Sequence, residues 1–158
     1  MGFGLGAAIG AQAGNPDKVV VHTTGDGCFR MNCHELATVE HYHLPIITVI
    51  FNNGCLGMVR QLQDLFYGGR LNAVDIPDQP DFVKLAEAYG CVGMRAFTKD
   101  EAIECIKKAN EINDRPVLID FRVWKDAMVW PMVAAGDSND NVTYMPGVKP
   151  LQRAGENE

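Results

Sequence analysis

Two apolar stretches, with an amphipathic segment between them, stand out in the first third of the chain. Residues 19–24 begin with three valines, and residues 44–51 are almost entirely apolar and β-branched. Such runs are typical of parallel strands that are buried on both faces. Between them, apolar residues recur roughly at helical spacing: Met31, Leu36, Val39 and Tyr42. We therefore predict a strand, a crossover helix and a second strand parallel to the first.

The rest of the chain continues to alternate helix and strand patterns. Helices are predicted at residues 59–67, 82–89 and 98–113, and strands at residues 91–95 and 116–123. Strands that alternate with helices through short loops are typical of a parallel sheet. The predicted fold class is α/β, a doubly wound parallel sheet with helices on both faces. We assign residues 1–136 to this domain and residues 137–158 to a polar C-terminal tail.

Local signals mark the ends of two helices. Asp81 is suited to cap the helix that Gly90 ends, and Thr98 and Glu101 have the spacing of a capping box. The helix that Thr98 opens is expected to bury one apolar face, made of Ala102, Ile103, Ile106, Ala109 and Ile112.

Polar residues follow both of the first two strands where each one ends. Gly25-Asp26-Gly27 follows the first strand, and Asn52-Asn53 follows the second, with Asn53 27 positions after Asp26. Parallel strands joined by a right-handed crossover end at the same edge of the sheet, so Asp26 and Asn53 should face one crevice. Magnesium is usually held by one or two side-chain oxygens plus substrate phosphates.

The residues around Asp26 suit a phosphate as well. Gly25 and Gly27 lack a Cβ atom, so we expect the backbone to turn sharply there and to approach a ligand closely. The backbone amides of Gly27 and Cys28 begin the next helix and would donate to a diphosphate. The pattern therefore predicts a magnesium-diphosphate clamp.

Composition and charge exclude several classes of function. The 158 residues include 14 basic and 20 acidic residues, giving a net charge of −6 without a basic cluster, so nucleic acid is not expected as a partner. No apolar run approaches the roughly 20 residues that cross a membrane. The five cysteines lack the spacing of a disulfide framework and indicate free thiols in a reducing compartment, so we expect a cytoplasmic location.

Other motifs are incomplete. The glycines of residues 1–14 do not form the dinucleotide fingerprint, and no strand precedes them. Because this segment is rich in glycine and alanine, a helix here must pack its backbone closely against something. Zinc is the alternative for Cys33, His34, His41 and His43, but Thr38 stands where a zinc-protease helix that begins at His34 needs its second histidine. We therefore interpret these histidines as part of a partly exposed helix.

Gly25-Asp26-Gly27 followed at this distance by Asn52-Asn53 resembles the fingerprint of thiamine-diphosphate enzymes. Within that group, residues 1–135 are similar to the large catalytic subunit of acetolactate synthase (acetohydroxyacid synthase). The similar strings are residues 1–5 (MGFGL), 57–61 (GMVRQ), 64–70 (DLFYGGR), 80–86 (PDFVKLA) and 130–133 (WPMV), besides Met31-Asn32 and residues 35–38. The resemblance implies thiamine diphosphate and Mg²⁺ as cofactors.

The resemblance also implies roles for single residues. Asp26, Asn53 and the backbone carbonyl of Cys55 would bind the metal, and Met1 would lie beneath the bent cofactor. The remaining cofactor contacts implied are Gly25, Gly27, Cys28, Leu56, Gly57 and Met58. Core packing is the alternative interpretation for Met58.

The activity implied is a transferase reaction: a 2-oxo acid, pyruvate, is decarboxylated and joined to a second pyruvate or to 2-oxobutanoate. In this family the activating glutamate lies in a separate pyrimidine-binding domain, and a further domain binds FAD. We match neither domain to this chain, so we expect it to be incomplete and inactive alone. A homo-oligomer and a small regulatory subunit are implied as partners.

Alternatives and departures from the family pattern remain. Another thiamine-diphosphate decarboxylase or carboligase, a noncatalytic cofactor-binding module, and a metal or nucleotide binder unrelated to thiamine are the other interpretations. Cys28 replaces a common serine, and a thiol is the weaker hydrogen-bonding group. His34 replaces a frequent glutamine, and Leu62 replaces the usual tryptophan of the substrate channel.

Overall fold

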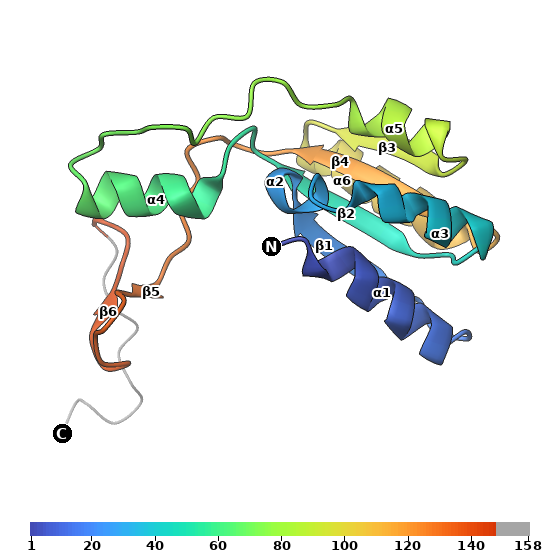
Figure 1. The fold of residues 1–158 in the computed structure, drawn as a ribbon, viewed down its shortest axis with the longest axis horizontal. Coiled ribbons are helices and arrows are strands. Elements are labelled where there is room, and N and C mark those ends of the chain that lie inside the picture. The colour runs from blue at the N-terminus through green and yellow to red at the C-terminus, as the bar shows by residue number, and fades with distance from the viewer. Residues whose placement is uncertain (148–158) are drawn as a thin grey trace. The chain divides into compact units, whose positions relative to one another are not determined.

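The computed structural model describes residues 1–147, in which one parallel sheet dominates (Figure 1). The chain divides into two compact units, with the boundary between Asp126 and Ala127. In the first unit the sheet has the order β1-β2-β4-β3, and its strands are β1 (Val21–Gly25), β2 (Ile47–Asn52), β3 (Val92–Ala96) and β4 (Val117–Arg122). All pairings are parallel, and β1 lies directly beside β2, as the sequence predicts.

Helices cover both faces of this sheet, which confirms the predicted fold class. The helical segments of residues 1–147 are α1 (Phe3–Gly14), α2 (Asp26–Phe29), the 3₁₀ turn η1 (Cys33–Glu35), α3 (Leu36–His41), α4 (Gly57–Phe66), α5 (Phe82–Ala88) and α6 (Lys99–Glu111), of which α1, α3, α5 and α6 supply the buried residues that pack on the sheet. On one face, α1, α3 and α5 bury Leu5, Val39 and Phe82 against Ile50 and Leu118. On the other face, α6 buries Cys105 and Ala109 against β2 and β4.

Both capping predictions are confirmed. The Asp81 side chain accepts hydrogen bonds from the amides of Val83 (3.0 Å) and Lys84 (3.3 Å) at the start of α5. The capping box of α6 is complete, because Thr98 accepts from the Glu101 amide while the Glu101 carboxylate accepts from the Thr98 amide.

Three details of the sequence interpretation are wrong. First, β1 is an edge strand in this unit and is not buried on both faces: Val21 is 54% exposed, since α6 covers the neighbouring strands instead. Second, the crossover is divided into α2, η1 and α3, which leaves Met31 and Tyr42 largely exposed. Third, Ile103 and Ile106 of α6 are exposed, and Cys105 takes the buried position.

The α1 helix packs closely against β1 because Gly4 has no side chain. A Cβ atom on Gly4 would lie 2.5 Å from Nε2 of His22, so this glycine makes room for the imidazole. His22 is buried, and its Nδ1 lies 3.4 Å from the Thr48 hydroxyl oxygen. Close backbone packing, expected for this segment, therefore occurs at Gly4; at Gly6 and Gly10 a Cβ atom would meet nothing.

The second unit contains a short antiparallel pair, β5 (Met132–Val133) and β6 (Val142–Thr143). The residue pattern did not predict β6, which lies within the segment assigned to the polar tail. The remainder of that tail, residues 148–158, lies outside the described residues. Among the helices of residues 1–147, none has the length and apolar character needed to cross a membrane.

Candidate functional site

The carboxyl ends of β1 and β2 meet at Asp26. This residue begins α2 directly after β1, and its side chain is buried, with 2% of the residue exposed. The backbone amide of Gly54, just beyond β2, donates to Asp26 Oδ2 over 2.9 Å. Gly54 has a φ of +72°, a conformation that favours glycine. The ends of β1 and β2 therefore meet, as the βαβ order predicts, and the Gly54 amide forms the hydrogen bond between them.

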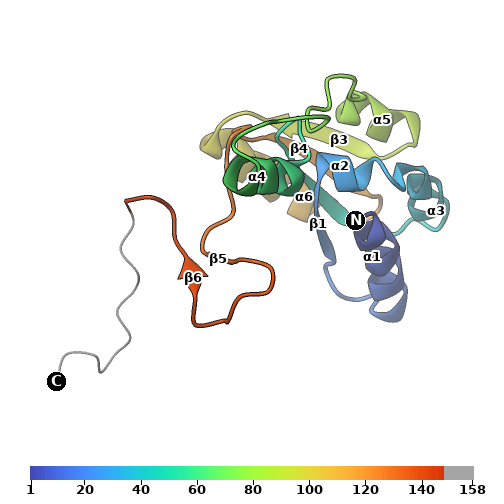
Figure 2. The same ribbon diagram turned by 60° about the vertical axis from the view of Figure 1, so that its left-hand side comes forward.

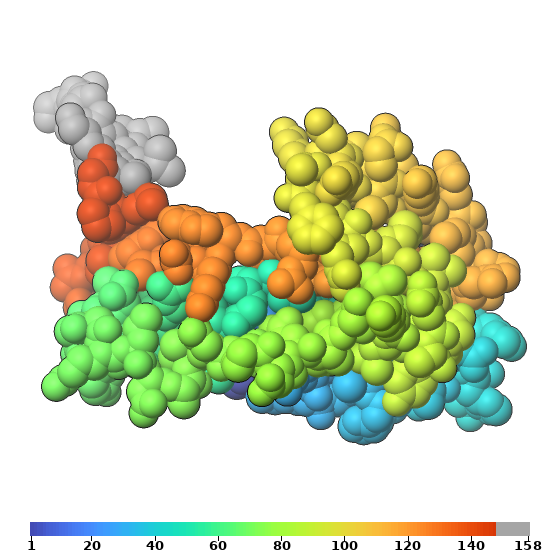
Figure 3. Space-filling model, turned by 90° about the horizontal axis from the view of Figure 1, so that it is seen from above, coloured from blue at the N-terminus to red at the C-terminus, as the bar shows by residue number. Residues whose placement is uncertain are grey.

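A loop from a distant part of the chain also reaches Asp26. The side-chain amide of Gln79 donates to the same oxygen, Oδ2. The loop is held by backbone hydrogen bonds from Leu56 to the Val74 carbonyl (2.8 Å) and from Ile76 to the Gly54 carbonyl (3.0 Å). Figure 3 shows this green loop lying along the teal residues that follow β2.

The charge of Asp26 is balanced by no basic side chain in residues 1–147. Its two hydrogen-bond donors are neutral, and the ion pairs of the described residues do not include it. Asp120, also buried, instead accepts from Arg95 Nε at 2.9 Å. A buried carboxylate without a counter-charge is costly, so a cation fits the Asp26 position.

Asn53 lies at the same edge, on the turn after β2. Its Oδ1 accepts a hydrogen bond from the Cys55 amide at 3.2 Å, so the side chain closes the turn over its own loop. A carboxamide oxygen has two lone pairs and can coordinate a metal while it accepts this bond. A Cβ atom on Gly57 would lie 3.0 Å from Asn53 Nδ2, so this glycine lets the carboxamide fit.

Gly25 and Gly27 do not have the roles expected from a sharp turn. Neither has a positive φ, and β1 leads straight into α2. A Cβ atom on Gly25 would meet nothing within 4 Å, so this position is open for a ligand to approach. A Cβ atom on Gly27 would lie 2.8 Å from Leu56, which shows that Gly27 admits the Leu56 side chain.

Cys28 and Cys55 differ in their surroundings. Cys28 is half-buried within the four-residue helix α2. Cys55 is 3% exposed, and burial raises the pKa of its thiol above the usual value. The Arg60 charge opposes this shift of the pKa, while the carboxylate of Asp26 adds to it. Cys55 therefore stays protonated near neutral pH, and its Sγ lies 3.7 Å from the Lys125 carbonyl.

Met1, Met58 and Leu62 lie on the surface of the first unit. Met1 is 74% exposed, Met58 52% and Leu62 42%, so core packing does not explain Met58. The side-chain amide of Asn32 donates to the Gly2 carbonyl, which holds the N-terminus beside α2 (Figures 1 and 2).

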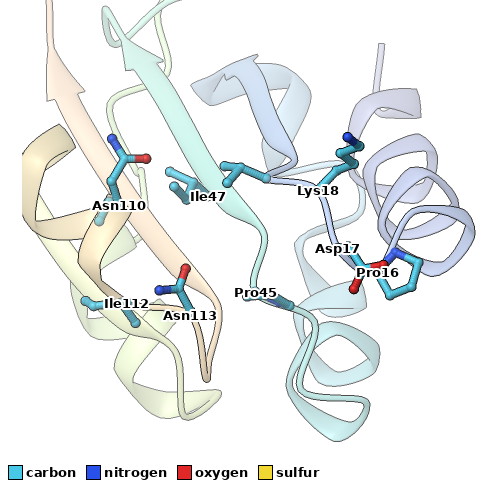
Figure 4. A pocket seen from close by; sticks show the side chains of 10 residues that line it. Pro16, Asp17, Lys18, Pro45, Ile47, Asn110, Ile112 and Asn113 are labelled. Carbon is cyan, nitrogen blue, oxygen red and sulfur yellow. The ribbon is translucent and has the colours of Figure 1, made fainter.

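Two hollows lie at opposite edges of the sheet. One, of about 440 Å³, is at the carboxyl edge and is lined in part by Gly54, Gln79, Arg95 and Arg122. The other, of about 160 Å³, is at the amino edge, where the labelled side chains come from the segment before β1, the start of β2 and the end of α6 (Figure 4). The candidate site belongs to the carboxyl edge.

Comparison with known proteins identifies the family of this site. Residues 1–121 match the model described as "Thiamine pyrophosphate enzyme, C-terminal TPP binding domain". The chain belongs to this family of thiamine pyrophosphate (TPP)-binding domains. The matched residues include Asp26, Asn53 and Gln79 of the candidate site.

Relatives of this TPP-binding domain carry one recurring name. The chain is 51% identical over 155 residues to the acetolactate synthase large subunit of Corynebacterium glutamicum, covering 96% of this chain and 25% of the relative. It is 40% identical over 147 residues to the acetolactate synthase large subunit of Haemophilus influenzae, covering 92% and 26%. The chain thus spans about a quarter of the length of these relatives.

A solved structure has the same fold. The TPP-binding domain resembles the thiamine diphosphate-dependent 4-hydroxybenzoylformate decarboxylase of Rhodococcus jostii RHA1, with a TM-score of 0.74 and 34% identity. The match covers 80% of this chain and 24% of that one.

Sequence reasoning missed Gly54 and Gln79 as site residues. Asn53-Gly54 after a strand is a turn signal, so a positive φ at Gly54 could have been inferred. Gln79 has no such signal, because its contact with Asp26 joins residues 53 positions apart.

Proposed function

We propose that this TPP-binding domain is the diphosphate- and magnesium-binding part of an acetolactate synthase. The observation that carries the proposal is the buried Asp26 carboxylate, which has only neutral donors in the described residues and stands beside Asn53 at the carboxyl edge of the sheet. The identity of about 50% to acetolactate synthase large subunits supports this branch of the family.

The residues present fit a magnesium diphosphate. Asp26 would supply the charged metal ligand, and Asn53 and the Cys55 carbonyl would supply neutral oxygens. Gly25 leaves open space for the ligand, and Met1 and Met58 offer exposed apolar surface. When bound, the cofactor supplies the chemistry that decarboxylates a 2-oxo acid and joins the product to a second one. The role of these residues is to bind and orient it.

The other proposed features concern the complete protein. We infer pyruvate and 2-oxobutanoate as substrates, pyrimidine-binding and FAD-binding domains, a homo-oligomer and a cytoplasmic location. We also infer a small regulatory subunit as a partner; the words "large subunit" in the names of the relatives support the existence of a smaller subunit.

Binding of the metal and the diphosphate is expected to be coupled, because two side chains and one carbonyl are too few ligands to hold magnesium tightly. Calorimetry of Mg²⁺ binding to the chain should show weak binding alone and much tighter binding with thiamine diphosphate present. Equal affinity in both titrations would contradict the shared site.

The reaction itself can be tested by replacement. We would exchange the matching quarter of the Corynebacterium glutamicum large subunit for this chain and measure acetolactate formed from pyruvate. The proposal predicts activity in the hybrid and its loss with Asp26→Ala.

The structural likeness to a 4-hydroxybenzoylformate decarboxylase favours a second candidate function, that of a 2-oxo acid decarboxylase. Carbon dioxide release without acetolactate would support that candidate instead.

A further inference from the structure

We propose that Gln79 is a positioning residue, which fixes the carboxylate of Asp26 so that one chosen oxygen faces the metal. This inference rests on the proposed function, since it assumes that Asp26 binds magnesium. The observation behind it is a contact that the residue pattern does not predict. The side-chain amide of Gln79 donates to Asp26 Oδ2 from the loop between α4 and α5.

The loop that carries Gln79 is anchored on both sides of this residue. Before it, backbone hydrogen bonds join Val74 and Ile76 to Leu56 and Gly54, and Asp75 forms a bridge with Cys55. After it, Asp81 caps α5 and accepts a hydrogen bond from Arg95 at 2.5 Å. Because the loop is held by hydrogen bonds on both sides of Gln79, this side chain reaches Asp26 from a defined position.

Both donors to Asp26 reach the same oxygen. The Gly54 amide and the Gln79 carboxamide both donate to Oδ2, and two donors on one carboxylate oxygen fix the rotation of the whole group. The other oxygen, Oδ1, would then be the one that binds the metal. Neutral donors suit this role, because they leave the negative charge of the carboxylate available to the cation.

Other metal sites indicate how much metal affinity the Gln79 hydrogen bond should contribute. Groups that orient a metal ligand without touching the metal typically contribute 10- to 100-fold to metal affinity. Gln79→Met keeps a side chain of similar length but removes the donor. We therefore expect this variant to raise the magnesium concentration for half-saturation by about 10-fold or more.

The control must change the same loop without touching Asp26. Gln63 of α4 serves this purpose: its side-chain amide donates to the Asn72 carbonyl at 3.1 Å, and its side-chain oxygen accepts from the Asn72 amide at 2.8 Å. Gln63→Met therefore loosens the beginning of the loop and leaves the Gln79 contact in place.

The experiment measures Mg²⁺ binding by calorimetry at saturating thiamine diphosphate, and Mn²⁺ binding by electron paramagnetic resonance, for the 158-residue chain and its variants. Gln79→Met should weaken both metals, while Gln63→Met should bind as the wild type does. The melting temperature in chelator should be alike for the two variants, which separates metal positioning from a general loss of structure. Equal metal affinity in Gln79→Met and the wild type, or equal weakening in Gln63→Met, would overturn the inference.

Asp26→Ala, measured in the same series, separates a failure of the proposed metal site from a failure of the proposed role of Gln79. If Asp26→Ala binds the metals as the wild type does, the proposed function fails at its metal site. If Asp26→Ala loses binding and Gln79→Met retains it, only the role of Gln79 fails.

Discussion

The backbone amide of Gly54 lies 2.9 Å from Asp26 Oδ2 and donates a hydrogen bond to it. This bond joins the residue that follows β1 to the turn that follows β2. Gly54 has a φ of +72°, so the chain turns away from this bond in a left-handed conformation that favours glycine. The candidate site is therefore built from backbone conformation as much as from side chains.

Gly54→Ala should weaken both folding and ligand binding. A side chain at this φ costs about 1–2 kcal/mol, and relief of that strain would move the amide away from Asp26. Urea unfolding should show a fall of this size in the free energy of unfolding. Gly25→Ala is the control, because its φ is −89° and its Cβ meets nothing; it should change that free energy by less than about 0.5 kcal/mol. A stable Gly54→Ala variant would contradict the role of the left-handed turn.

Gly4→Ala should destabilise the packing of α1 on β1. Its Cβ would lie 2.5 Å from His22 Nε2, and overpacking of this kind costs about 1–3 kcal/mol. Gly10→Ala in the same helix meets no atom within 4 Å and should raise the free energy of unfolding by up to about 1 kcal/mol, since alanine favours helix. Urea unfolding should therefore show a lower free energy of unfolding for Gly4→Ala and a higher one for Gly10→Ala. Changes of the same sign in both variants would contradict the packing of Gly4 against His22.

His22 should make the chain sensitive to mild acid. Burial lowers the pKa of His22 below its ordinary value of 6.5, so the unfolded chain binds a proton that the folded chain does not. Stability from this residue is complete above pH 6.5 and falls below it, by at most about 1.4 kcal/mol per pH unit. The free energy of unfolding, measured by urea at several pH values between 7.5 and 5, gives the slope of stability against pH. The slope should be reduced in His22→Gln and kept in His34→Gln, an exposed site; an unchanged slope in His22→Gln would contradict the assignment.

Arg95→Met should destabilise the carboxyl edge of the sheet. Arg95 donates to the fully buried Asp120 at 2.9 Å and also pairs with Asp81. Its removal would leave the Asp120 carboxylate with the neutral Asn52 amide at 2.9 Å and with Arg122 at 3.9 Å as its nearest remaining cation. Breaking a buried pair in this way costs about 3 kcal/mol or more. Arg115→Met, which breaks the exposed pair with Asp114, should leave the melting temperature unchanged. Similar melting temperatures for the two variants would show that the Arg95 pair contributes little.

The sequence was sufficient to predict the parallel order of β1 and β2, because a right-handed crossover leaves few alternatives. It also predicted both helix caps, since Asp81 and Thr98 act on residues three positions away or nearer. The exposure of Val21 could not be predicted, because a valine run is the same whether or not a helix covers it. Gln79 was missed because its partner is 53 positions away and no local pattern connects the two.

The central claim is that Asp26 and Asn53 hold a magnesium diphosphate, and thiamine diphosphate binding tests it most directly. Calorimetric titration of the chain with thiamine diphosphate should show binding with Mg²⁺ and none with chelator. Asp26→Ala should abolish the binding, and Asn53→Ala should weaken it less, because Asp26 supplies the only charge among the proposed ligands. Binding that is equally tight in wild type, Asp26→Ala and Asn53→Ala would contradict the claim and move the site elsewhere.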